Sequence, residues 1–318
     1  MRQAGRYLPE YQKLKTKYSL DEMFSTPELI RQITILPVEL LGVDAAILFA
    51  DILHVIKMLG ASAHFKPEGG ISVTPILCGN QDLQKLHRKS PYETLFFVEE
   101  GITLLKKELR VPLIGFCGGP FTVASYMIES EKKGELSQTK KWLYSDPESF
   151  HHLLQMITEA SIDYLKMQIK AGVNAIQIFD SWAGVLPKEE FTIFILPYLK
   201  QLIDALKDSN IPILIFCRGS SLFASELVSL KPSGISFDWS YPMHEIRKGV
   251  PKTIAVQGNL DPEILNSSFI LIKKKTVELL KSMEGDTGFI ANLGHGVLPY
   301  IPFENVRCFV DTVKAFQG

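Results

Sequence analysis

The chain has 318 residues, of which 46% are hydrophobic and 22% charged, and its formal net charge is -1. The apolar content is sufficient for a buried core and excludes a disordered chain, while the balanced charge argues against a nucleic-acid-binding protein. Charges or glycines interrupt every apolar run well short of the roughly 18 residues of a membrane helix, so we expect no membrane span. Because the net charge is close to zero, we also expect no nucleic-acid partner.

The N-terminal residues MRQAGRYLPEY are polar and lack the apolar core of a signal peptide. The four cysteines are widely separated and form no CxxC pair, which indicates reduced thiols rather than a disulfide framework. These cysteines are Cys78, Cys117, Cys217 and Cys308. Both features predict a cytoplasmic protein.

Two arginines lie four residues apart in this first segment. Arg2 and Arg6 flank Gln3 and Ala4, and on a loop they would place two guanidinium groups in one cavity. Arginine is the side chain best suited to bidentate binding of carboxylates. A solvated basic terminus is the alternative that these two residues leave open.

Seven short apolar runs follow along the chain. They are apolar at consecutive residues and bounded by Gly, Pro or polar residues, which is typical of strands buried on both faces of a parallel sheet. The runs cover residues 43–52, 111–120, 175–182, 212–220, 234–240, 253–260 and 289–296.

Helical patterns separate these runs. We expect helices over 147–171, 187–208, 262 to about 283, and 303–316. Asp146 and Asp261 each precede a proline, which predicts an N-cap followed by Pro at the first helical position. Residues 64–75 predict a hairpin with Gly69 and Gly70 at its turn.

Polar or special residues end nearly every strand run. They include Asp51, Asp180, Arg218, Asp238, Asn259 and His295. In a (β/α)8 barrel all strand C-termini meet at one mouth, so we predict this barrel, as one domain over residues 1–318, rather than a doubly wound sheet. Because only seven runs are visible, the first barrel strand is expected to precede Met1.

Four strand-end positions carry candidate chemistry. Asp51 closes a buried run, where a carboxylate is costly unless it is paired or used, although a helix cap is an equal alternative. Tyr126 follows the segment Gly118–Thr122, whose backbone N–H groups are expected to receive anions. Taken alone, Tyr126 is more typical of a packing tyrosine. Ser181 is either a hydroxyl donor to a ligand or a cap. His295 lies between two glycines, which permit close approach of a ligand.

No HxxxH, HxH or cysteine pair supplies the usual ligands of a metal, so no metal site is predicted. His54 follows Asp51 closely, and a histidine near an apolar face is more often a core residue than a partner of the carboxylate.

These motifs together resemble the uroporphyrinogen decarboxylase family. The resemblance starts in MRQAGRYLPEY and continues in order through FADIL, GGPFTVASYMIE, IFDSWAG, VQGNLDP and NLGHGVLP. It implies a (β/α)8 barrel that forms a homodimer. It also implies an enzyme of haem biosynthesis without metal or cofactor, which removes four acetate carboxyls of uroporphyrinogen III as CO2 to give coproporphyrinogen III.

The resemblance also assigns site residues. The implied substrate-binding residues are Arg2, Gln3, Ala4, Arg6, Phe49, Asp51, Tyr126, Ser181 and His295, with Asp51, Arg2 and Tyr126 in catalytic roles. Family members often have Glu-Ser-His where this chain has Asp180-Ser181-Trp182. With no cofactor as electron sink, a protonated pyrrole must take that role, and Asp51 would stabilise its cation. Arg2 would deliver the proton and bind carboxylates, and Arg6 would bind carboxylates.

Two alternatives remain at this point. A zinc-dependent corrinoid or coenzyme M methyltransferase shares the fold, but Ile215 stands where its histidine would be, and only Cys217 remains of its His-x-Cys pair. A weakly active tetrapyrrole-binding protein is the second alternative, for a chain that truly starts at Met1.

Overall fold

The structure is a computed structural model that describes residues 7–66, 70–129 and 135–316. Its main sheet contains seven strands that pair in parallel and in chain order. They are β1 (Ala46–Ile47), β4 (Leu113–Gly118), β5 (Ala175–Asp180), β6 (Ile213–Cys217), β7 (Gly234–Ser236), β8 (Ala255–Leu260) and β9 (Phe289–Leu293). Each of the seven predicted runs forms one of these strands, which confirms the α/β class.

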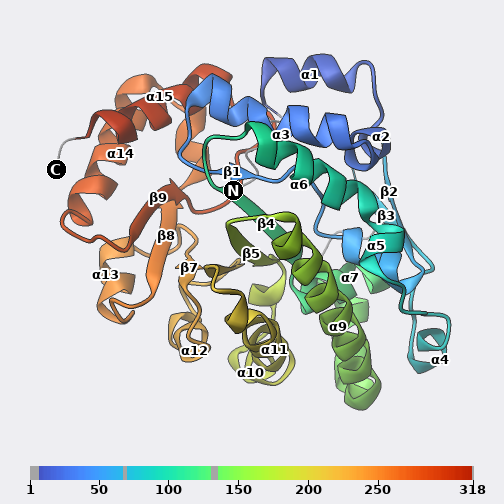
Figure 1. Cartoon of the computed structure of the whole chain (residues 1–318). Helices are drawn as coiled ribbons and strands as arrows, with labels where there is room; N and C mark the ends of the chain where they lie inside the picture. Colours follow the sequence, from blue (N-terminus) through green and yellow to red (C-terminus); the bar gives the residue numbers. More distant parts are fainter. Residues whose placement is uncertain (1–6, 67–69, 130–134, 317–318) are drawn as a thin grey trace.

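Helices cover the outside of this curled sheet (Figure 1). The longer ones are α3 (Pro27–Leu41), α6 (Phe96–Glu108), α7 (Pro120–Glu129), α9 (Pro147–Ala171), α11 (Leu196–Leu206), α14 (Phe269–Ser282) and α15 (Phe303–Ala315). Shorter helices are α1 (Pro9–Lys15), α2 (Leu20–Ser25), α4 (Asn80–Leu83), α5 (Pro91–Thr94), α8 (Ser137–Ser145), α10 (Lys188–Phe194), α12 (Ala224–Ser229) and α13 (Met243–Lys248). Short 3-10 helices are η1 (His54–Leu59), η2 (Ala183–Val185), η3 (Lys207–Ser209) and η4 (Pro262–Asn266).

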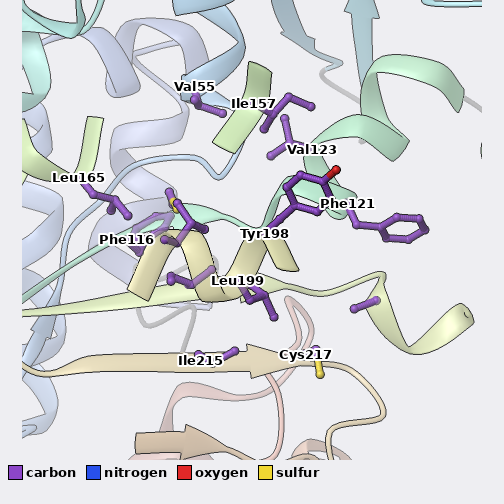
Figure 2. Packing of buried hydrophobic residues seen from close by; sticks show 14 of the residues in the cluster. Val55, Phe116, Phe121, Val123, Ile157, Leu165, Tyr198, Leu199, Ile215 and Cys217 are labelled. Carbon is purple, nitrogen blue, oxygen red and sulfur yellow. The ribbon is translucent and has the colours of Figure 1, made fainter. Parts of the chain in front are cut away.

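The strands are buried on both faces, as their apolar runs predicted. β6 is buried at all five positions. Figure 2 shows Leu165 of α9, Leu199 of α11 and Ile215 of β6 among the buried side chains of the main core cluster. Burial of such side chains stabilises the fold by about 1.5–3 kcal/mol each relative to exposure.

Two predicted helices prove to be interrupted. The expected helix over 187–208 is wrong as a single element, because α10 ends before Ile195 and a new helix, α11, begins at Leu196 with Pro197 in its first turn. The expected helix from 262 to 283 divides into η4 and α14, since Ser268 starts a new N-cap by accepting from the Leu271 N–H. Helix α9 is confirmed with its predicted cap, the Asp146 side chain accepting from the Ser149 N–H.

The predicted hairpin is confirmed as the antiparallel pair β2 (Ser62–Phe65) and β3 (Ile71–Thr74). Gly69 of its expected turn lies outside the described residues, whereas Gly70 has a φ of 105°, which favours glycine. Among the described helices, none is both long enough and apolar enough to cross a membrane.

A second apolar cluster joins the two ends of the sheet. It combines Phe24 and Ile33 from the first helices with Leu260, Leu293 and Phe309 from the last elements. Helix α15 packs against α3 accordingly. The edge strands β1 and β9 are therefore brought toward each other by side-chain packing.

His54 belongs to the core, as its apolar surroundings suggested. Its ring is 3% exposed and meets the rings of Phe24 and Phe97 edge-on, with centroids 5.4 and 5.7 Å away. Burial, and secondarily the charge of Lys57, lower the pKa of His54 to about 3. The imidazole is therefore neutral in the folded protein at pH 7.

Replacing His54 with Phe is expected to flatten the pH dependence of stability between pH 6.5 and about 4. In the wild type the unfolded chain binds a proton below its ordinary pKa of about 6.5, whereas the folded state does so only near 3. The free energy of unfolding of the wild type therefore decreases as the pH is lowered through that window, by at most about 1.4 kcal/mol per pH unit. Urea unfolding of both proteins at several pH values measures this difference. Parallel pH profiles for the two proteins would contradict it.

Candidate active site

A pocket opens at the C-terminal ends of the parallel strands. It encloses about 1090 Å³ between its walls, including the part open to solvent. Its walls come from β1 and the residues after it, from β4, β5 and β6, and from the segment after β9, with α1, α2 and β3 at one side. Both edges of the sheet thus contribute to one concave site.

The structure brings five of the predicted site residues together. Phe49, Asp51, Tyr126, Ser181 and His295 all line this pocket. They come from segments separated by up to 246 positions between Phe49 and His295. The other four predicted site residues, Arg2, Gln3, Ala4 and Arg6, lie outside the described part of the chain.

Asp51 is half-buried just after β1 and is oriented by the local backbone. Its Oδ1 accepts a hydrogen bond from the Leu53 N–H at 2.8 Å. A carboxylate has about four acceptor positions, so the same group has capacity to accept from a ligand as well. Asp51 therefore has the pocket position, together with a local turn bond to Leu53. The helix-cap alternative is wrong, because the N-cap of the following helix η1 is Leu53, without a side-chain cap.

Phe49 is fixed from both sides. The buried Thr34 hydroxyl of α3 accepts from the Phe49 N–H at 2.9 Å, and the Phe49 ring stacks on Phe24 with centroids 4.7 Å apart. Because these partners are themselves buried, the ring forms a rigid apolar wall next to Asp51.

Three phenylalanines that we did not predict as site residues also line the pocket. Phe116, Phe179 and Phe216 lie on the neighbouring strands β4, β5 and β6 and make edge-on contacts at 5.5 and 6.1 Å. Phe216 continues the series to His295, with ring centroids 5.6 Å apart. The signal in the sequence was alternation: Phe179 lies two residues before Ser181, so both point to the same face of the strand.

His295 is half-buried and is placed by its surroundings as well. Its ring meets Trp239 at 6.3 Å and nearly at right angles. A Cβ on the neighbouring Gly294 would lie 2.6 Å from the Trp239 backbone nitrogen, so only glycine allows this approach of the two loops. Backbone packing thus accounts for Gly294, whereas the second glycine, Gly296, lines the pocket.

The N-terminus of α7 is not open to a substrate anion, and the expectation for Gly118–Thr122 is wrong in this respect. Asp180, at the end of β5, already accepts from the Thr122 N–H at 2.9 Å, and the Gly119 N–H donates to the Phe179 carbonyl oxygen. Burial raises the pKa of Asp180 to about 6, and the hydrogen bonds from Thr122 oppose that rise.

Ser181 and Tyr126 take the positions expected of neutral donors. Ser181 does not cap the following turn η2, whose N-cap is Trp182, so the capping alternative is wrong. Tyr126 lies on α7, half-buried, and its side chain packs against the main core cluster as well as lining the pocket. Among the described lining residues, Asp51 is the only acidic side chain and neither Lys nor Arg occurs.

This arrangement suits a ligand with a broad apolar face and N–H donors. The aromatic rings offer apolar contact area, and Asp51 offers acceptors and negative charge. Tyr126, Ser181 and His295 can donate hydrogen bonds to oxygen atoms at the periphery of such a ligand.

No group of three or more His, Cys, Asp or Glu side chains gathers as metal ligands within the described residues. Cys217 is fully buried, and this burial raises the pKa of its thiol well above the ordinary range.

Comparison with known proteins gives consistent results. The family model described as uroporphyrinogen decarboxylase (URO-D) matches residues 1–316. A uroporphyrinogen decarboxylase of Protochlamydia amoebophila is 46% identical over 318 residues, which is all of this chain and 87% of that protein. The enzyme of Syntrophotalea carbinolica is 39% identical, and the match spans 98% of this chain and 91% of that protein. The enzyme of Pelobacter propionicus is 40% identical, and the match spans 99% of this chain and 92% of that protein.

Solved structures of more distant proteins share the fold. A methyltransferase from Methanosarcina mazei superposes with a TM-score of 0.76 at 22% identity, over 92% of this chain and 86% of that one. A B12-independent methionine synthase from Shewanella gives 0.62 at 14% identity, over 91% and 85% of the two chains.

Proposed function

Since the chain belongs to the uroporphyrinogen decarboxylase family, we propose that it converts uroporphyrinogen III to coproporphyrinogen III in tetrapyrrole biosynthesis. The observation that carries this proposal is the pocket in which Asp51 is the one carboxylate among the described lining residues and in which three phenylalanine rings from adjacent strands lie in series. Such a site matches a macrocycle whose pyrrole N–H groups point to its centre and whose rings are apolar.

The reaction replaces each acetate carboxylate by a proton. Protonation of a pyrrole ring carbon gives a cation, the bond to the carboxylate carbon breaks, and its electron pair neutralises the ring as CO2 leaves. A second proton on the exocyclic carbon and loss of the ring proton then give a methyl group. Asp51 accepts from the pyrrole N–H groups and stabilises the cation in a partly buried site, where electrostatic interactions are strong.

The substrate carries eight carboxylates, which need donors and positive charge. Tyr126, Ser181 and His295 supply donors in the pocket. We assign Arg2 and Arg6, with Gln3 and Ala4, to carboxylate binding from the motif that carries the family resemblance, and Arg2 also to proton delivery. Tyr126 is assigned to catalysis as a donor to the carboxylate that leaves.

The same proposal includes the complete architecture. Packing of α15 against α3 and lining of the pocket by both sheet edges support a (β/α)8 barrel, formed by the chain 1–318 as one domain. We further propose a cytoplasmic homodimer that works without metal or cofactor.

Replacing His295 with Ala is expected to raise the KM for uroporphyrinogen by roughly 10- to 100-fold, because a hydrogen bond to a charged carboxylate contributes about 1.5–3 kcal/mol. Partly decarboxylated products should accumulate as the macrocycle is held less firmly. His295→Gln, which retains a donor, is the control and should lie closer to the wild type. Chromatography of products at several substrate concentrations gives both readouts. If neither changes in the Ala variant, His295 has only a packing role.

The proposal itself is tested by incubating the purified protein with uroporphyrinogen III under reducing conditions and separating the products. We expect coproporphyrinogen III with four CO2 released per molecule, and no dependence on added metal. Absence of decarboxylation, or tightly bound stoichiometric zinc with methyl-transfer activity, would contradict the proposed function.

A further inference from the structure

Asp180, Thr122 and Trp182 form a hydrogen-bonded group that we call the β5–α7 junction. The Thr122 backbone N–H and hydroxyl both donate to Asp180 Oδ1, at 2.9 and 2.5 Å. The same hydroxyl oxygen accepts from the Trp182 N–H at 2.9 Å. One carboxylate and one hydroxyl thus connect the end of a strand, the start of a helix and the loop between β5 and η2.

The junction is completely enclosed. Asp180 is 1% exposed and Thr122 is not exposed at all. A Cβ on Gly119 would lie 2.4 Å from Asp180 Cβ and Cγ, so the backbone before α7 passes directly over the carboxylate. Because there is no space for either group to move, a change in one must shift the other.

Each of the two linked segments carries a pocket residue. Ser181 stands between Asp180 and Trp182, and its backbone is therefore held at both neighbouring positions. Tyr126 lies four residues after Thr122 on α7, hence on the same side of the helix one turn later. Both Ser181 and Tyr126 line the pocket, whereas Asp180 and Thr122 do not.

We propose that Asp180 is a positioning residue that, through Thr122 and the Trp182 N–H, fixes the Ser181 and Tyr126 hydroxyls relative to each other in the pocket. This inference rests on the proposed function only for its kinetic readout. The second oxygen of Asp180, Oδ2, has no partner within the described residues. A buried carboxylate oxygen without a partner costs stability, which is tolerated more readily where a group serves function than where it serves the core alone.

The discriminating variant is Thr122→Val, which removes the hydroxyl that links the two segments. We expect kcat/KM for uroporphyrinogen to fall by about tenfold or more, since a displacement near 1 Å of positioning groups can cost up to about a hundredfold. Thr122→Ser restores the hydroxyl and should recover most of the activity. Partly decarboxylated products should accumulate in the Val variant alone.

Thr276→Val is the matched control. Thr276 of α14 is equally buried, and its hydroxyl donates to the Ile272 carbonyl oxygen at 2.7 Å, but it does not line the pocket. Thr122→Val loses two buried hydrogen bonds, to Asp180 and from the Trp182 N–H, whereas Thr276→Val loses one, so Thr122→Val is expected to lose more stability. Only Thr122→Val should lose activity, and Thr276→Val should stay within about twofold of wild type, as expected for a remote independent site.

Hydrogen exchange of the backbone amides provides a readout that needs no substrate. The Trp182 amide and the other amides of segment 181–185 should exchange faster in Thr122→Val than in wild type. Their exchange rates should be the same in Thr276→Val as in wild type. Unchanged exchange at Trp182, or equal kcat/KM in Thr122→Val and Thr276→Val, would overturn the positioning role. If Thr122→Val exchanges faster but the wild type does not decarboxylate uroporphyrinogen, the hydrogen-bonded link between the two segments is supported and the proposed function is contradicted.

Discussion

Asp51→Asn is expected to give a folded protein that turns over uroporphyrinogen roughly 100- to 1000-fold more slowly, the loss typical of removing one group aimed at developing charge. Asn retains an oxygen that accepts from the Leu53 N–H, so the local backbone should keep its conformation. The amide has no negative charge to balance the pyrrole cation, and its NH2 group would face the pyrrole N–H groups as another donor.

Asp261→Asn is the matched control for this loss. Asp261 follows β8, and its Oδ1 accepts from the Glu263 N–H at 2.9 Å, the same turn that Asp51 makes with Leu53. Asp261 does not line the pocket, so its variant should keep near wild-type turnover. Initial rates of CO2 release measure both variants. Near-full activity of Asp51→Asn would remove Asp51 from the mechanism.

The second large effect concerns stability, and is expected for Asp286→Ala. Arg247 and Asp286 are joined by hydrogen bonds of 2.6 and 3.2 Å, and their side chains are only 6% and 7% exposed. Removing the carboxylate leaves a buried guanidinium without its partner, which typically costs about 3–5 kcal/mol. Urea unfolding followed by circular dichroism measures this change in the free energy of unfolding.

Lys252→Ala provides the control on the same carboxylate. Lys252 also contacts Asp286 Oδ2 at 2.6 Å, but its side chain is 76% exposed, and exposed pairs contribute about 0–1 kcal/mol. If Asp286→Ala lowers the free energy of unfolding no more than Lys252→Ala does, the buried Arg247–Asp286 pair contributes no more to stability than an exposed pair.

The pKa of Asp286 sets the pH at which this contribution is lost. Burial opposes ionisation, but hydrogen bonds from Arg247, Lys252 and the Gly288 N–H lower the pKa of Asp286 to about 2. The folded-state value lies below the ordinary value of 3.8, so the contribution is complete above about pH 4 and declines as the pH falls toward 2. The wild type and Asp286→Ala should therefore become more alike in stability at acidic pH.

The order of the strands and the polar residues at their ends were predictable from the sequence. Strands covered on both faces require consecutive apolar residues, and strand C-termini in such folds meet at one site, so Asp51, Ser181 and His295 could be placed together. Phe179 could have been added from its alternation with Ser181. Phe116 and Phe216 could not, because an apolar run without a polar marker does not reveal which side chains face the pocket and which face the helices.

The contacts of the β5–α7 junction were equally hidden from the sequence. Gly118–Thr122 resembles an open anion site, and only the structure shows that Asp180, 58 positions after Thr122, occupies it. The interruptions at Ile195 and Ser268 were missed for another reason: the apolar periodicity continues across both, while local capping and Pro197 divide the helices.

The most direct test of the account is a crystal structure of the protein with coproporphyrinogen bound. We predict the macrocycle in the pocket lined by Phe116, Phe179 and Phe216, with pyrrole nitrogens about 2.7–3.2 Å from the Asp51 carboxylate, as hydrogen bonds require. A macrocycle bound elsewhere, or in this pocket with its pyrrole nitrogens turned away from Asp51, would contradict it.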